Sequence, residues 1–170
     1  VDPNHTGVNY CPLRYADVVL MAAEAYNETN NTTEAWKLLN DVRQRAEATP
    51  ITSANYASLM KAPKVYNLDF IDDSDDAGKF RTALYWERGF ELCYEGQRKY
   101  DFLRWGCLGD ALRAAQAYIE SWYPDANEYI NASTLQSWDP VSWASSNYVA
   151  GHNFVDGKHE LYPIPLAEIQ

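Results

Sequence analysis

The sequence predicts an all-α fold made of helical hairpins and long irregular loops. Three observations predict it. Apolar residues recur at three- and four-residue spacing in several separate stretches, which is typical of amphipathic helices. Asn-rich or glycine-containing turns separate these stretches. No stretch alternates apolar and polar residues convincingly enough to predict a strand.

The first expected element is a pair of helices joined by a short turn. The first helix spans about residues 13–27, and its apolar stripe consists of Leu13, Ala16, Leu20, Ala23 and Tyr26. The Asn-rich turn at 27–33 ends it, and Thr33 is placed to cap the next helix. That helix spans about residues 34–48 and is expected to bury Ala35, Leu38, Leu39, Val42 and Ala46. Two antiparallel helices with so short a connection form a hairpin.

The hairpin partly fits the tetratricopeptide pattern. Small alanine side chains let two helices approach closely, and a tyrosine fills the space beside them. The matching residues are Ala23 and Tyr26 on the first helix and Ala35 and Leu39 on the second. The usual Trp, Gly and closing Pro of the pattern are not matched. We therefore expect a tetratricopeptide-like hairpin.

For the rest of the chain the sequence predicts several more helices, followed by irregular structure. A short helix near 54–60 lies in a loop, and a long helix is expected over about 79–94, with Asp75 and Asp76 favoured at its amino end by the helix dipole. Gly96 ends or bends that helix, and further helices are expected at 97–105 and 110–122. After residue 124 the periodicity fades, and the prolines at 163 and 165 require an extended segment.

Composition excludes several classes of protein. The chain has 170 residues, 14 Lys and Arg against 24 Asp and Glu, and a formal net charge of −10. Such a charge repels nucleic-acid backbones and anionic lipid surfaces. No apolar run approaches the roughly eighteen residues that a transmembrane helix needs. The length suits one domain, and since both ends look cut, we expect residues 1–170 to be a piece of a longer protein.

The densest charged segment is residues 87–106. Glu87, Glu91 and Glu95 recur every four residues on one helix face, which would suit a glycosidase or a metal site. Arginines lie close by, and apolar residues separate the charges, so a structural ion-pair core is favoured. Its expected members are Glu87, Arg88, Glu91, Glu95, Arg98, Asp101 and Arg104, with Phe90, Leu92, Phe102 and Trp105 as the apolar core.

No metal, cofactor or catalytic motif stands out. Asp73, Asp75 and Gly78 match three positions of a calcium-binding loop, but Ala77 and Leu84 stand where ligands are required. The three histidines form no metal-binding motif, and nucleophile and phosphate-binding motifs are absent. The three cysteines match no zinc spacing, and we expect them to be small buried side chains on helices. We therefore expect no catalytic residue, no metal and no cofactor.

The segment between Arg113 and Lys158 contains no Lys or Arg and is rich in aromatic residues, Asn and Ser. Aromatic ring faces stack on the C–H faces of sugars, and amides and hydroxyls bind sugar hydroxyls, so the segment suits a neutral glycan. Trp138, Trp143 and Tyr148 are the candidate ligand-binding residues. The alternative is that these aromatics anchor a long loop on the helices.

Three separated stretches resemble the carboxy-terminal part of SusD/RagB-family proteins. Residues 13–25 together with 39–46 are similar to the family's helix pair. Residues 87–106 resemble its most recognisable signature, with Gly89 where a second Arg is frequent. Residues 161–165 resemble its closing Trp-Pro-Ile-Pro segment, with Tyr162 in place of Trp.

The resemblance implies a non-catalytic surface lipoprotein that binds oligosaccharides or peptides. It implies a TonB-dependent (SusC-like) transporter as partner, on the extracellular face of the outer membrane, and a remaining upstream part of the same protein. Two other functions stay open from the residues. One is a helical scaffold for protein–protein docking without a ligand of its own. The other is a helical glycosidase that uses Glu87 and Glu91.

Overall fold

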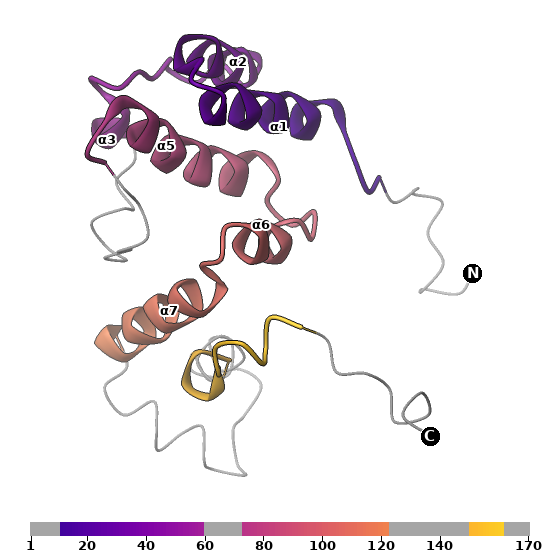
Figure 1. Cartoon of the computed structure of the whole chain (residues 1–170), viewed down its shortest axis with the longest axis vertical. Coiled ribbons are helices and arrows are strands. Elements are labelled where there is room, and N and C mark those ends of the chain that lie inside the picture. Colours follow the sequence, from indigo (N-terminus) through magenta and orange to yellow (C-terminus); the bar gives the residue numbers. More distant parts are fainter. Residues whose placement is uncertain (1–10, 60–72, 123–149, 162–170) are drawn as a thin grey trace. The chain divides into compact units, whose positions relative to one another are not determined.

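The structure is a computed structural model that describes residues 11–59, 73–122 and 150–161 (Figure 1). Every regular element among these residues is a helix, and none is a strand. The helices are α1 (Tyr15–Glu28), α2 (Thr32–Arg45), α3 (Tyr56–Leu59), α5 (Asp76–Glu91), α6 (Arg98–Arg104) and α7 (Leu108–Trp122). A further helical turn occupies 150–153. The prediction of an all-α fold is confirmed for the described part of the chain.

The chain divides into two compact units. The described residues of the first are 11–59 and 73–98, which hold α1, α2, α3 and α5. Those of the second are 99–122 and 150–161, which hold α7 and nearly all of α6.

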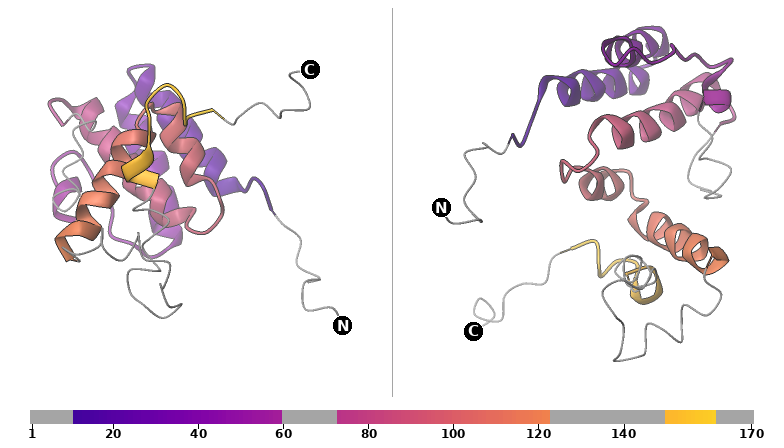
Figure 2. Two further views of the ribbon diagram at one scale, coloured as in Figure 1. Left: turned by 90° about the horizontal axis from the view of Figure 1, so that it is seen from below. Right: turned by 180° about the vertical axis from the view of Figure 1, so that it is seen from behind.

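The first unit is built from the α1–α2 hairpin with α5 packed against both helices (Figure 2). Its core joins one stripe from each helix; the fully buried members are Leu20, Ala23, Ala35, Leu39, Phe80, Ala83 and Leu84. The Trp36 ring meets the Phe80 ring edge-on, with centroids 5.1 Å apart. Each large apolar side chain buried in this way contributes about 1.5–3 kcal/mol. The predicted hairpin therefore forms because its alanines let three helices meet.

Two residues of the expected α1 stripe lie outside the core. Leu13 is 53% exposed and precedes the helix, and Tyr26 is 41% exposed. The buried face instead contains two polar residues, Asp17 and Asn27. Asn27 donates its amide to the Ala77 carbonyl at 3.3 Å, which ties the end of α1 to the start of α5. A polar side chain with a partner across the core replaces the expected tyrosine.

Helix starts follow local capping. Asp75 accepts a hydrogen bond from the Gly78 N–H at 2.7 Å, and α5 begins at the next residue, Asp76. The acidic residues expected at this helix end are therefore confirmed there. The cap of α2 is Asn31, which accepts from the Glu34 N–H, so the expectation of Thr33 was wrong. An Asn two residues earlier serves the same purpose and starts the helix sooner.

The second unit brings the 150–161 segment against α7. Arg113 of α7 contacts Asp156 at 3.3 Å and lies 5.9 Å from the centre of the Phe154 ring. A Cβ atom at Gly109 would come 2.6 Å from an Asp156 oxygen and 2.8 Å from Phe154. The absence of a side chain at this position permits the close approach.

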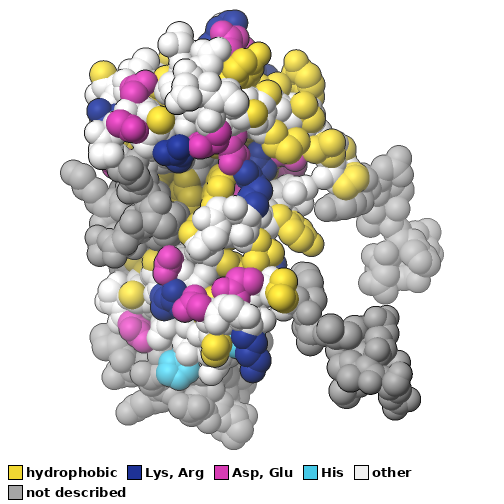
Figure 3. Space-filling model, in the orientation of Figure 1, with side chains coloured by type: hydrophobic (Ala, Val, Ile, Leu, Met, Phe, Trp, Pro, Cys, Tyr) yellow, Lys and Arg dark blue, Asp and Glu magenta, His cyan; other side chains and the backbone are white. Residues whose placement is uncertain are grey.

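The outward face of α1 is apolar. Tyr15, Val18 and Met21 are 82%, 42% and 42% exposed, and Figure 3 shows apolar side chains gathered over this helix. None of the helices in the described part of the chain combines the length and apolar character that crossing a membrane requires.

Candidate functional site

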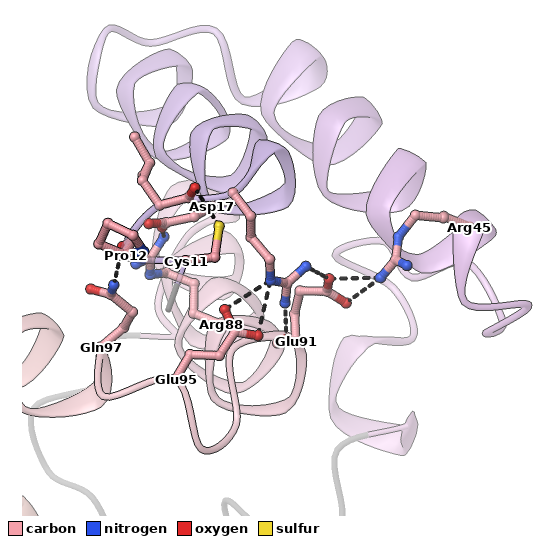
Figure 4. A network of polar contacts seen from close by, with 10 residues as sticks. Cys11, Pro12, Asp17, Arg45, Arg88, Glu91, Glu95 and Gln97 are labelled. Carbon is pink, nitrogen blue, oxygen red and sulfur yellow. Dashed lines mark hydrogen bonds and ion pairs between the residues drawn. The ribbon is translucent and has the colours of Figure 1, made fainter. Parts of the chain in front are cut away.

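A row of carboxylates runs along α5 and into the loop that follows it. Glu87 and Glu91 lie one turn apart on the helix, and Glu95 follows in the loop at 92–97. Because residues four apart share a helix face, the first two carboxylates point to the same side. On that side lie arginines from α2 and from the residue just before α1 (Figure 4).

Glu87 is the most enclosed of the three. Its side chain is 7% exposed and forms an ion pair with Arg43 of α2, whose side chain is 11% exposed. Burial raises the pKa of Glu87 above its ordinary value, and the nearby Arg43 partly opposes that shift. Arg43 also donates to the Thr49 carbonyl at 2.8 Å. The pair therefore joins α5, α2 and the chain that leaves α2.

Glu91 and Glu95 share one arginine. The guanidinium of Arg14 contacts a Glu91 oxygen at 2.5 Å and both Glu95 oxygens at 2.9 and 2.8 Å. It also donates to the Glu91 carbonyl. Arg45 reaches both oxygens of Glu91 at 2.6 and 2.9 Å. Hydrogen bonds to Glu95 and then Glu91 raise the pKa of Arg14, so this guanidinium keeps its charge.

Arg88, on the same helix as Glu87 and Glu91, forms an ion pair with Asp17 of α1. Its guanidinium lies 2.8 Å from Asp17, and the two side chains are 4% and 6% exposed. Because both groups are so deeply buried, removing one of them would leave the other charge buried without it, which is strongly destabilising.

Arg98, at the start of α6, turns back onto α5. It donates to the Tyr85 carbonyl at 2.7 Å, and its guanidinium lies 4.0 Å from the centre of the Tyr85 ring. A Cβ atom at Gly89 would lie 3.3 Å from the Arg98 guanidinium carbon. Glycine at this position thus leaves room for the arginine.

The remaining charged residues of the expected core lie in the second unit. Asp101 is buried, and Arg104 contacts it from the same helix at 3.1 Å. Of the expected apolar core, Leu92 is buried, but Phe90 is 58% exposed, so its assignment to the core was wrong. Phe90 lies at the surface and stacks on the buried Trp86, with ring centroids 6.2 Å apart.

The carboxylates of α5 find their partners outside the segment at 87–106. Arg14, Arg43 and Arg45 belong to the first 45 residues, whereas Arg88 and Arg98 face Asp17 and Tyr85 instead. The sequence does contain a signal for these distant partners. Two arginines near the end of α2 and one just before α1 lie within the stretches that carry the family resemblance.

This arrangement offers little for bond-breaking chemistry. A glycosidase needs two carboxyl groups that flank a bound sugar. Here guanidinium groups contact Glu87 and Glu91, whose side chains are 7% and 8% exposed. A shallow depression near Lys37 and Asp41 lies on another part of the surface. Among the described residues, no cluster of three or more His, Cys, Asp or Glu side chains could hold a metal ion.

Trp138, Trp143 and Tyr148 lie outside the described residues. Cys107 is buried as expected, but Cys11 and Cys93 are exposed, so their expected burial was wrong. Both lie in segments with little packing, one ahead of α1 and one after α5.

The known proteins that this chain is similar to belong to one family. A family model described as the SusD family matches residues 2–170. SusD-like protein P25 of Formosa agariphila is 36% identical over 124 residues, which are 73% of this chain and 20% of that protein. SusD-like protein P38 of the same organism is 34% identical over 104 residues, 61% of this chain and 18% of that protein. The matched part spans about a fifth of these relatives. No solved structure gives a significant match.

Proposed function

This chain belongs to the SusD family, and on that premise we propose that it is part of a non-catalytic surface protein that binds a glycan. The observation that carries the proposal is the family match over residues 2–170. In this proposal residues 1–170 are the carboxy-terminal part of a larger SusD-like protein, whose curated relatives extend well beyond the matched part.

The ion pairs of the first unit support a binding role over an enzymatic one. The carboxylates that a helical glycosidase would use, Glu87 and Glu91, have buried side chains and form ion pairs with Arg43, Arg14 and Arg45. A general acid needs a carboxyl group within reach of the glycosidic oxygen, and these two side chains are only 7% and 8% exposed. In the proposed function these charges, together with Arg88, Glu95, Arg98, Asp101 and Arg104, hold the helices in place.

Trp138, Trp143 and Tyr148 are the residues that we propose to contact the glycan, because they belong to a segment with no Lys or Arg, and aromatic rings suit neutral sugars. The test is isothermal titration of the full-length protein against a panel of oligosaccharides and peptides. We expect an oligosaccharide to bind, and we expect Trp138→Ala and Trp143→Ala each to weaken it at least about tenfold, a loss of about 1.4 kcal/mol. Tyr15→Ala removes an 82% exposed aromatic from α1 and is the matched control.

The second candidate function is a helical scaffold that binds no ligand of its own. The apolar outward face of α1 favours it, since such faces mark contacts between proteins or helices. The titration separates the candidates. A scaffold predicts that no oligosaccharide or peptide binds, and unchanged affinity in both tryptophan variants would show that Trp138 and Trp143 do not contact the ligand.

The proposed partner is a TonB-dependent (SusC-like) transporter in the outer membrane. The proposed location is the extracellular face of that membrane, with a lipid anchor on the full-length protein. Affinity purification of the full-length protein from detergent-solubilised membranes tests the partner, and protease treatment of intact cells tests the location. Failure to recover a transporter, or protection from the protease, would contradict this part of the proposal.

A further inference from the structure

Two segments of the first unit have little apolar packing of their own. Ahead of α1, Cys11, Pro12 and Leu13 are all exposed. In the loop at 92–97, Leu92 is buried, whereas Cys93, Tyr94 and Gly96 are exposed. Apart from Leu92, hydrophobic burial therefore contributes little to the conformation of these two segments.

The loop also contains a residue in an unfavourable backbone conformation. Tyr94 has φ of 64°, in the left-handed region that residues with a side chain rarely adopt. Its ring is fully exposed and makes no packing contact that would offset this cost. Such a conformation persists only where neighbouring contacts hold it. The residues on its carboxyl side make such contacts: the Glu95 and Gln97 side chains are hydrogen-bonded, and the Glu95 N–H donates to the Leu92 carbonyl at 3.1 Å.

Both neighbours bind the segment ahead of α1. Glu95 accepts from Arg14 with both carboxylate oxygens at 2.8–2.9 Å, and Gln97 donates to the Pro12 carbonyl at 2.8 Å (Figure 4). The same guanidinium of Arg14 reaches Glu91 at 2.5 Å at the end of α5. One side chain thus bridges α5, its following loop and the start of α1.

We propose that Arg14 acts as a clamp between these two segments. It holds the extended segment at 11–14 against the loop at 92–97, so that loss of the guanidinium releases both together. The clamp also fixes the direction in which the chain enters α1, because Arg14 is the residue immediately before that helix and its carbonyl accepts from the Asp17 and Val18 N–H groups. This inference depends only on contacts within the first unit and stands whether or not the protein binds a glycan.

The test is hydrogen–deuterium exchange of the full-length protein. Two regions report: the first turn of α1, where Asp17 and Val18 donate to the Arg14 carbonyl, and the loop, where Glu95 donates to the Leu92 carbonyl. In Arg14→Gln we expect exchange to rise about tenfold in both, the equivalent of about 1.4 kcal/mol. Exchange within α2 should stay unchanged.

Three further variants make the test specific. Glu95→Gln leaves Arg14 paired with Glu91, and we expect it to raise exchange at the start of α1, 81 residues away in sequence. Arg14→Lys keeps the charge but cannot bridge both carboxylates with a fork, so its effect should be intermediate. Lys37→Gln breaks an exposed ion pair within α2 and should change neither region.

The outcomes decide the proposal. A rise in both regions for Arg14→Gln and for Glu95→Gln supports the clamp. A rise confined to the mutated segment would overturn it, because the two segments would then be independent. A rise spread evenly over α1, α2 and α5 in the Glu95→Gln protein would also overturn it, because the contact would then support the whole unit.

Discussion

The buried pair of Asp17 and Arg88 gives the sharpest stability prediction. The two groups lie 2.8 Å apart, with side chains 6% and 4% exposed. At an effective dielectric constant of about 20, their attraction at this distance is about 6 kcal/mol, much of it offset by desolvation. Asp17→Asn removes the countercharge but leaves the guanidinium buried. We expect the free energy of unfolding to fall by about 3–5 kcal/mol.

Urea unfolding followed by the fluorescence of the buried tryptophans of this unit measures the loss. The exposed pair of Lys37 with Glu34 is the control, and Lys37→Gln should leave the midpoint unchanged. The double variant Asp17→Leu with Arg88→Met should lose less than Asp17→Asn, because no charge is then left buried. If Asp17→Asn unfolds at the same urea concentration as the control, the pair does not hold α1 to α5 and our reasoning is wrong.

Three further predictions concern single side chains. Burial raises the pKa of Glu87, so the folded protein keeps a proton on this carboxyl group that the unfolded chain releases as the pH rises above 4.5. The free energy of unfolding of the wild type, compared with that of Glu87→Gln, should therefore fall from that pH upward, and a rise measured by urea unfolding would contradict this. Asn40 makes two hydrogen bonds of 2.8 Å with the backbone of the buried Ile51, so Asn40→Ala should lower the free energy of unfolding by about 1–3 kcal/mol. A loss near zero would show that water replaces these two hydrogen bonds. Asp75→Ala removes the cap of α5 and should lower the free energy of unfolding by about 1 kcal/mol, with faster hydrogen exchange confined to the first turn of that helix. Unchanged exchange there would show that the cap contributes nothing.

The helices themselves could be predicted from the sequence because their signals are local. Spacing of apolar residues located α1, α2, α5 and α7 to within a few residues, and Asp75 marked the start of α5. Periodicity reports which residues share a face, and capping depends on residues three positions apart. Periodicity and capping each involve only residues close together in the sequence, so a single stretch of chain is enough to recognise them.

The burial of individual residues could not be predicted in the same way. Tyr26 and Phe90 continue apolar patterns, yet they are 41% and 58% exposed. Asn27 is buried because the Ala77 carbonyl, fifty residues away, accepts its hydrogen bond. The apolar stripe indicates which side of a helix faces the core, but whether a residue at the edge of that stripe is covered depends on a partner helix that lies elsewhere in the sequence.

The ion pairs show the same limit. The charges of α5 suggested partners within the segment at 87–106, where neighbours in sequence are visible. The guanidinium groups that contact Glu87 and Glu91 come from Arg14, Arg43 and Arg45, 44 to 77 residues away. Only packing α5 against the α1–α2 hairpin brings them together.

The most direct test of the central claim is to incubate full-length Glu87→Gln, Glu91→Gln and wild-type protein with an oligosaccharide that the wild type binds. Affinity and release of reducing sugar are then measured in the same samples. We predict that all three proteins bind the oligosaccharide and that none releases sugar, because the paired carboxylates hold helices together. Release of sugar by the wild type that either substitution abolishes would contradict the account.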